Sequence, residues 1–338
     1  MEVLFDRQEY DRLYNCSLYE QGYFDHMKVP NRVIGLFYIL SGLTYISLYI
    51  PTIYVMALPK YRKFSCYKIM LFLAVIDSIC LTMVCVLYGV FAYKGMVFCD
   101  SPMLFYVSGC IGTALWNCTC LTVIVLAINR LCDLLNTGWL HALFSKGRTK
   151  YWLLIPIIDF VLVMWYSRVF LFTSVYYAEF NDPYVGTIFE NLDDTKYLSY
   201  ATTINDIVSP IIMVLLYSVI CVLLLIRTYK IKFDRATSTA TRLTNFQKTT
   251  VIQSCLICCL FVLCGAFYNY INIFGGTAGL MTLTQIIWQS CHGGPVIIYL
   301  IFNRSLRNEF KKLMGEMTKK NVSTMSINDT GNSNHNNT

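Results

Sequence analysis

Charged side chains that interrupt long apolar segments are the residues of this 338-residue chain most able to do chemistry. Asp77 and Asp206 each lie inside such a segment, and Asp159 and Arg168 share another. A charge in an apolar membrane segment is costly, so it usually lines a ligand or ion pathway or pairs with another charge. The alternative for each acid is a buried polar group that only fixes the packing of helices.

Fifteen cysteines and four histidines raise the question of a metal or redox site. Cys118 and Cys120 lie in one apolar run, and Cys255, Cys258 and Cys259 lie in another, with no histidine or acid beside either cluster. No histidines have the spacing of a zinc site, and such cysteines usually pack as small apolar residues. With no nucleophile–base pair and no nucleotide-binding loop in the sequence, we expect no enzyme activity, no metal and no cofactor.

The longest apolar run, Tyr106–Leu135, is uncharged until Arg130. It is longer than the roughly 20 residues that cross a bilayer. A guanidinium in hydrocarbon is costly, so Arg130 belongs at the membrane surface. We therefore predict a tilted membrane helix whose last turns present Asn129 and Arg130 to an aqueous face.

The composition also indicates an integral membrane protein, because 56% of the residues are apolar and only 14% are charged, against about 25% charged in soluble domains. We predict an all-α membrane protein, a bundle of seven transmembrane helices. Each predicted segment is long enough to span a bilayer. The segments are Val33–Leu58, Tyr67–Tyr93, Pro102–Leu135, Trp152–Val175, Tyr197–Ile226, Thr250–Ile273 and Leu280–Phe302.

The basic residues predict the orientation. With the N-terminus outside, twenty lysines and arginines fall in inside loops and the tail, and six fall outside. This asymmetry follows the positive-inside rule, and it explains the net charge of +7 without a nucleic-acid partner. The first residues lack a basic stretch followed by an apolar one, so we expect no cleaved signal peptide.

The predicted organisation has four parts. After the last apolar segment, Leu306, Phe310 and Leu313 recur at helical spacing, with basic residues on the other face. This pattern is typical of an amphipathic helix that lies on the inner leaflet. The parts are an extracellular arm (1–32), a seven-helix domain (33–302), the amphipathic surface helix (303–318) and a disordered cytoplasmic tail (319–338).

The outside arm carries two further predicted features. Asn15-Cys16-Ser17 is an acceptor for N-glycosylation. Cys16 and Cys99 are the two cysteines that this topology places outside, where the compartment is oxidising. We predict a disulfide between them that ties the arm to the start of the third helix; the alternatives are two free thiols or a bond to another chain.

Aromatic side chains are dense in these segments, and we expect some of them to line a ligand cavity in the outer half of the bundle. Pro210 cannot donate a hydrogen bond to the Asp206 carbonyl, which suits either a binding site or a simple kink. We also predict an ion pair between Arg168 and Asp206, because an unpaired charge is costly there. The predicted lining residues are Thr113, Trp116, Asn117, Thr202, Asp206, Tyr268 and Trp288.

A set of short motifs is spread over residues 14–312. They are Tyr14-Asn15-Cys16-Ser17, Leu48-Tyr49-Ile50-Pro51, Ser65-Cys66-Tyr67-Lys68-Ile69-Met70, Val97-Phe98-Cys99, Pro102, Gly109, Gly112, Trp116, Leu126-Ala127-Ile128-Asn129-Arg130, Pro295 and Tyr299-Leu300. With seven membrane segments in this orientation, the set resembles the nematode serpentine chemoreceptors, most closely class T, among the G-protein-coupled receptors. The motifs are specific as a set, and each is weak alone.

The resemblance implies roles for several residues. Arg130 resembles the arginine that engages the G protein, although Asn129 stands where an acid usually holds that arginine. Tyr299 resembles the tyrosine of the seventh-helix N-P-x-x-Y motif. Asp77 resembles the second-helix aspartate that often helps to hold a sodium ion, or else serves packing. Gly265 stands where a switch tryptophan is usual in the sixth helix.

The resemblance implies a chemosensory receptor for an external small molecule, coupled to a heterotrimeric G protein, in the plasma membrane of sensory neuron cilia. Its partners would be the ligand, the G protein and the lipid bilayer, with no nucleic acid. Two other classes remain open. An odour-gated seven-helix channel predicts an internal N-terminus, against the charge count. A transporter predicts internal repeats and broken helices, and no repeat is visible.

Overall fold

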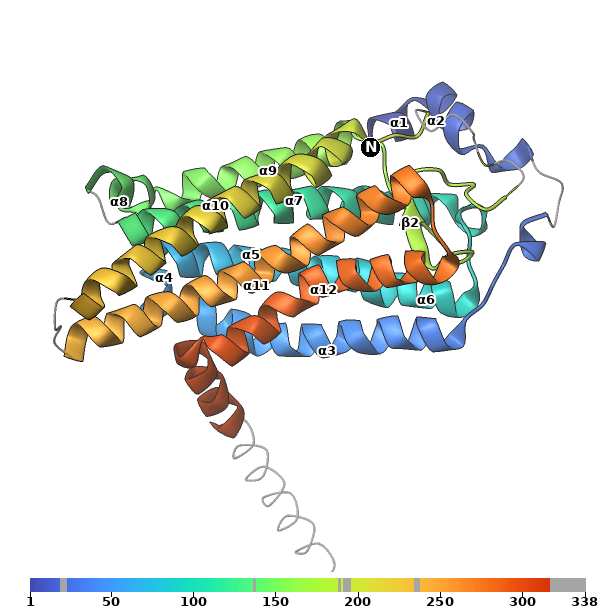
Figure 1. Cartoon of the computed structure of the whole chain (residues 1–338). Coiled ribbons are helices and arrows are strands. Elements are labelled where there is room, and N and C mark those ends of the chain that lie inside the picture. Colours follow the sequence, from blue (N-terminus) through green and yellow to red (C-terminus); the bar gives the residue numbers. More distant parts are fainter. Residues whose placement is uncertain (19–22, 136–137, 188–189, 191–195, 234–237, 317–338) are drawn as a thin grey trace, which may run out of the picture.

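The computed structural model describes residues 1–18, 23–135, 138–187, 190, 196–233 and 238–316. The predicted tail, 319–338, and the last residues of the predicted surface helix lie outside this part. Figure 1 shows long helices side by side, with residues 1–18 at one end of the bundle and residues 304–316 at the other. We call these the arm end and the tail end.

The long helices correspond to the seven predicted segments. They are α3 (Arg32–Ala57), α5 (Ser65–Leu81) continuing through a π-helical turn, η3 (Thr82–Leu87), into α6 (Tyr88–Lys94), then α7 (Pro102–Leu135), α9 (Thr149–Tyr166), α10 (Tyr200–Phe233), α11 (Ser238–Phe274) and α12 (Ala278–Phe302). The short elements are α1 (Glu2–Phe5), α2 (Arg7–Tyr14), η1 (Cys16–Leu18), η2 (Tyr23–His26), α4 (Pro59–Arg62), η4 (Phe98–Asp100), α8 (Gly138–Phe144), β1 (Leu171–Thr173) and β2 (Ala178–Phe180).

α7 is the central helix of the bundle. In its most apolar stretch 83% of the residues are buried, against 17% for α9 and 22% for α10. A helix that is apolar all round belongs in the interior. α7 therefore has its neighbours on every side, and its side chains reach both ends of the bundle.

The outer helices turn apolar side chains outward. Ile158 and Leu162 on α9 and Leu215 and Leu225 on α10 are 50–69% exposed. Continuous exposed apolar surface of this kind is avoided by soluble proteins and suits contact with lipid. Six of the spans in the described part are long and apolar enough to cross a membrane. α12 has 25 residues but also carries Gln285, Gln289 and His292, which face the interior.

The π-helical turn η3 interrupts the second span. A π turn leaves backbone groups without their usual helical partners and is frequent at functional sites. Here Gln289 of α12 donates from Nε2 to the carbonyl oxygen of Val84, at 3.0 Å. The interruption is thus stabilised by a side chain of the seventh helix.

The fourth span is shorter than predicted. We expected a helix over Trp152–Val175, but α9 ends at Tyr166, and β1 pairs antiparallel with β2 so that Phe172 lies opposite Glu179. A short buried strand and a helical segment have the same apolar composition, so periodicity alone does not separate them. The hairpin covers the arm end of the bundle near α6 and α7 (Figure 1).

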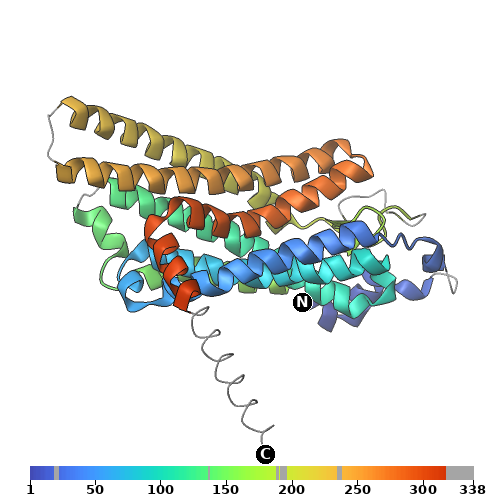
Figure 2. The ribbon, with the colours of Figure 1, turned by 90° about the horizontal axis from the view of Figure 1, so that it is seen from below.

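α12 ends at Phe302, and after Asn303 residues 304–316 form a further helix at an angle to it (Figures 1 and 2). The Asn303 side chain caps this helix by accepting from Leu306 N at 3.1 Å. Leu306 is buried, and Glu309 forms an ion pair with Lys60 at 2.5 Å. This helix is therefore fixed to α4 at the tail end.

Candidate ligand-binding site

A small cavity lies inside the arm half of the bundle, between α7, α10, α11, α12 and the β-hairpin. Measured as the space that the centre of a water molecule can occupy, its volume is about 20 Å³, so the cavity admits a small polar head group. Its lining residues are Thr113, Trp116, Phe170, Glu179, Thr202, Asp206, Tyr268 and Trp288. Six of the seven predicted lining residues are among them. Asn117 lies behind the wall, where its Nδ2 donates to Thr113 O and Thr202 Oγ1 at 2.9 and 3.2 Å.

Aromatic rings form much of the wall. Trp116 of α7 stacks on Phe261 of α11, with centroids 5.5 Å apart and planes at 9°. Trp288 of α12 meets Trp116 edge to face at 6.3 Å. Offset and edge-to-face arrangements are the favourable ones for aromatic pairs, so three helices are held together at the cavity by ring contacts.

Asp206 faces this cavity from α10. Its Oδ1 accepts from Trp116 Nε1 at 2.6 Å and from Asn205 Nδ2 at 3.5 Å. The carbonyl that Pro210 leaves free is also used, because Asn269 of α11 donates from Nδ2 to Asp206 O at 3.3 Å. The turn loosened by proline is thus a contact between α10 and α11.

The predicted ion pair between Arg168 and Asp206 is wrong. Arg168 Nη2 instead lies 2.8 Å from Glu9 Oε1 of the arm. Because α9 ends at Tyr166, Arg168 belongs to the segment after the helix and reaches outward. Hydrogen bonds from Arg12 and Arg168 lower the pKa of Glu9 to about 2. Asp159 does not line the cavity either; it borders a separate groove between α9 and α10.

Glu179 is a second buried acid that the sequence reasoning missed. It lies on β2, is 6% exposed, and accepts a hydrogen bond from the Tyr88 hydroxyl. Burial raises its pKa to about 8. In the sequence Glu179 looks like an ordinary acid of the loop that follows the fourth apolar segment. Its only signal in the sequence is its place in an apolar and aromatic stretch, residues 174–180.

A buried polar cluster lies next to the cavity on its tail-end side, near the middle of the bundle. Asp77 and His292 are fully buried, with His292 Nδ1 at 2.9 Å from Asp77 Oδ1. The Tyr49 hydroxyl lies 2.9 Å from Asp77 Oδ2 and 2.8 Å from the His292 carbonyl oxygen. The histidine ring also meets Trp288 edge to face at 5.8 Å. The cluster therefore touches the cavity wall directly.

These residues do not fit a sodium ion at Asp77. Both carboxylate oxygens already have partners, one of them an imidazole that becomes a cation on protonation. A sodium site needs several oxygen ligands, whereas His292 presents nitrogen. The sodium role suggested by the resemblance is therefore not supported by this geometry.

A second polar group lies toward the tail end, around Arg130. Asn129 donates from Nδ2 to Ser65 Oγ at 2.9 Å, and Arg130 Nη2 lies 3.6 Å from Met70 Sδ. Among the described residues, neither Arg130 Nε nor the buried Tyr299 hydroxyl has a hydrogen-bond partner. Tyr299 lies close enough to Arg130 for an electrostatic interaction. The predicted coupling residues are thus brought together, and part of their hydrogen-bonding capacity is unused.

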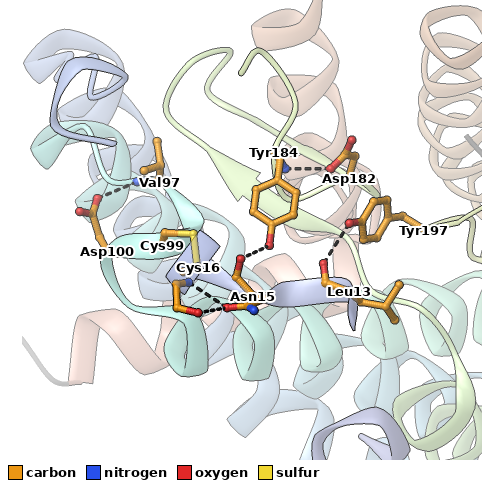
Figure 3. The surroundings of a disulfide bond; sticks show 10 residues. Leu13, Asn15, Cys16, Val97, Cys99, Asp100, Asp182, Tyr184 and Tyr197 are labelled. Atoms are coloured by element: carbon orange, nitrogen blue, oxygen red, sulfur yellow. Dashed lines mark hydrogen bonds between the residues drawn. A yellow bond between two sulfur atoms is a disulfide. The ribbon is translucent and has the colours of Figure 1, made fainter. Parts of the chain in front are cut away.

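The arm is fixed over the arm end of the bundle (Figure 3). A disulfide joins Cys16 to Cys99, the predicted pair, with Cα atoms 5.6 Å apart. The Tyr197 hydroxyl donates to Leu13 O at 2.9 Å, and the Tyr184 hydroxyl donates to Asn15 O at 3.2 Å. Figure 3 shows these two tyrosines converging on the arm near the disulfide. The arm is therefore a docked element of the structure.

Comparisons with known proteins agree with this arrangement. The family model described as serpentine type 7TM GPCR chemoreceptor Srt matches residues 3–323. Serpentine receptor class T-55 of Caenorhabditis elegans is 24% identical over 306 residues, which cover 88% of this chain and 79% of that protein. The residues matched by the family model span the arm, the bundle and the cavity together. The chain therefore belongs to the Srt family of serpentine seven-transmembrane chemoreceptors.

Proposed function

We propose that this chain is a chemosensory receptor that binds an external small molecule in the cavity and activates a heterotrimeric G protein at the tail end. The arm end would face outside the cell at the plasma membrane, and the tail end would face the cytoplasm. The charge asymmetry of twenty basic residues against six supports this orientation. On the same orientation, Asn15 would carry a glycan, and residues 304–316 would lie along the inner leaflet.

The observation that carries the proposal is a set of buried residues between the cavity and Arg130, joined by contacts near the cavity and by electrostatic proximity at Tyr299. Trp288 lines the cavity and touches His292, which binds Asp77. Tyr299 lies within electrostatic reach of both Asp77 and Arg130. Packed side chains with more than one arrangement can transmit a change between distant sites. A ligand that alters the position of Trp288 therefore acts on the coupling residues through this set.

The expected mechanism is a shift between two packings of the bundle. A ligand that binds one packing more tightly increases its population. We expect the tail ends of α10 and α11 to move outward in the active packing, with the Asp206–Asn269 contact as the pivot. Arg130, Asn129 and Tyr299 would then contact the G protein. Because Asn129 is not an acid, it cannot supply the ion pair with Arg130 that usually stabilises the inactive state, and basal activity is expected.

The test is G-protein nucleotide exchange with the variant Arg130→Ala. We expect exchange to fall to the level without receptor, while surface expression and ligand binding remain within about 2-fold of wild type. Lys94→Ala is the matched control, since Lys94 is an exposed cation at the arm end, and it should leave exchange unchanged. Normal exchange by Arg130→Ala would contradict the coupling role.

No observation favours the channel or the transporter. The interior prolines Pro51, Pro156, Pro210 and Pro295 all lie inside continuous helices of the described part, whereas transporter sites use broken helices. Epitope tags at the two termini distinguish the receptor from the channel, because the channel class requires the N-terminus inside the cell. Staining of an N-terminal tag on intact cells is the expected result.

A further inference from the structure

We infer that the ligand of this cavity carries a protonated primary amine, which pairs with the carboxylate of Glu179. The inference rests on the proposed function only in taking the cavity as the receptor's ligand site. The charges, the hydrogen-bonding groups and the aromatic rings of the cavity all favour such a ligand.

The cavity holds two carboxyl groups and no cation. Among the described residues, Glu179 interacts with the Tyr88 hydroxyl, and Asp206 with Trp116 and Asn205, all of them neutral donors. Buried acids are normally paired with a cation, because an unpaired charge is costly away from water. The missing countercharge is what a cationic ligand would supply.

Glu179 is better placed than Asp206 to bind a cationic ligand. Asp206 Oδ1 already accepts from both Trp116 and Asn205, and the Trp116 contact, at 2.6 Å, holds the tryptophan in the wall. Glu179 accepts from one neutral donor, the Tyr88 hydroxyl, at Oε1. The higher pKa of Glu179, about 8, shows how strongly burial opposes its charge until a cation is present.

Aromatic rings lie beside this carboxyl. A Cβ added at Gly112 would be 3.5 Å from the Tyr88 hydroxyl, 3.7 Å from Glu179 Oε1 and 3.9 Å from the Trp288 ring. The carboxyl and the indole therefore border the same spot, which the glycine leaves open. Tyr268 lies within electrostatic reach of both acids. An ammonium next to an aromatic face gains further stabilisation from the ring quadrupole.

Hydrogen bonding selects the kind of cation. A primary ammonium carries three N–H donors that can bond the Glu179 carboxylate, whereas a trimethylammonium group has none. The apolar body of the ligand must then displace lining side chains, because the cavity is small. When Glu179 is protonated before binding, one proton leaves to solvent as the ammonium binds; a neutral amine would instead take that proton.

The test is binding to the purified full-length receptor in lipid nanodiscs, which needs no G protein. The probes are two matched series: benzylamine, benzyltrimethylammonium, benzyl alcohol and benzoate, and n-butylamine with n-butanol and butyrate. Binding is measured by calorimetry and by the rise in melting temperature. We expect a primary amine to bind most tightly in its series. Glu179→Gln should weaken amine binding by about 30-fold or more, the loss typical of a buried charge pair.

Glu190→Gln is the matched control, because Glu190 is an exposed acid of the same loop and should leave binding unchanged. Equal binding of the alcohol, no binding by either amine, or amine binding that survives Glu179→Gln would each overturn the inference. Nucleotide exchange driven by a neutral ligand would also overturn it and leave the proposed function standing. Amine binding that produces no nucleotide exchange on any G protein would support the inference and contradict the proposed function.

Discussion

Glu179 makes the stability of the ligand-free receptor depend on pH. Its folded-state pKa, about 8, is above the ordinary value of 4.5. The folded state therefore holds its proton while the unfolded chain loses it, so stability falls as pH rises from about 4.5 to about 8. We expect the melting temperature of the receptor in nanodiscs to fall by roughly 5 °C over this range. The titratable groups around this carboxyl in the described part are Tyr88, Tyr268, Cys80 and Asp206, which lines the same cavity.

Glu179→Gln should flatten this dependence and raise the melting temperature at pH 8, since glutamine keeps the hydrogen bond from Tyr88 without a charge. Glu190→Gln should keep the wild-type slope. A slope that persists in Glu179→Gln would assign the pH dependence to another group.

The contacts of Asp77 predict that sodium has little effect on the receptor. The His292 ring contacts one carboxylate oxygen of Asp77, and the Tyr49 hydroxyl donates to the other. Ligand affinity should therefore change less than about 2-fold when sodium chloride is replaced by choline chloride at constant ionic strength. His292→Ala frees one oxygen and is the variant most able to gain sodium sensitivity. A loss of affinity of 10-fold or more in wild type with added sodium would show that a sodium site exists after all.

The inward position of some residues follows from hydropathy alone. Trp116, Asp206 and Trp288 interrupt apolar helices, so their inward position follows from the membrane environment. Glu179 was missed because it lies in a loop, where acids are ordinary. The partner of Arg168 was wrong because it depends on where α9 ends, and a sequence locates such ends only to within a few residues.

The arm is stabilised as an element by its disulfide. Cys16 and Cys99 are separated by 83 residues, and closing a loop of this length contributes about 4.5 kcal/mol in the chain-entropy model, less any strain. The double variant Cys16→Ser, Cys99→Ser should lower the melting temperature and weaken ligand binding, because the arm covers the cavity end. Mass spectrometry of non-reduced peptides checks the bond itself.

A linked Cys16–Cys99 peptide from mature surface protein is the expected result. Cys259→Ser is the matched control, since Cys259 is an exposed cysteine of α11 outside the disulfide, and its melting temperature should not change. Free, alkylated Cys99 on surface protein would contradict the bridge.

The number and order of the membrane-spanning helices were predicted from the sequence, but their ends and interruptions were not. The seven spans follow from long apolar runs, which only helices can satisfy in a membrane. The sequence did not separate β1 from the end of the fourth helix, because both are short apolar stretches. Nor did it predict the π turn η3, whose partner Gln289 is supplied by a distant helix. The tail-end extensions of α10 and α11 lie in polar sequence and carry no hydropathy signal.

At the scale of the whole molecule, the polar groups are gathered along one interior path. The cavity, the Asp77–His292 pair and Arg130 follow one another between the arm end and the tail end, while the outer helices present apolar side chains. This distribution places these buried polar groups inside the bundle, between its two ends. Under the proposed function, a ligand and a G protein would act on the same set of residues from opposite ends.

Such coupling must be reciprocal, because two ligands that favour the same state strengthen each other by the same factor. The direct measurement is the affinity of the receptor in nanodiscs for an agonist, with and without nucleotide-free G protein. We predict binding at least 5-fold tighter with the G protein, reversed by a non-hydrolysable GTP analogue and absent in Arg130→Ala. An agonist affinity that is the same with and without G protein would contradict the coupling of the cavity to Arg130.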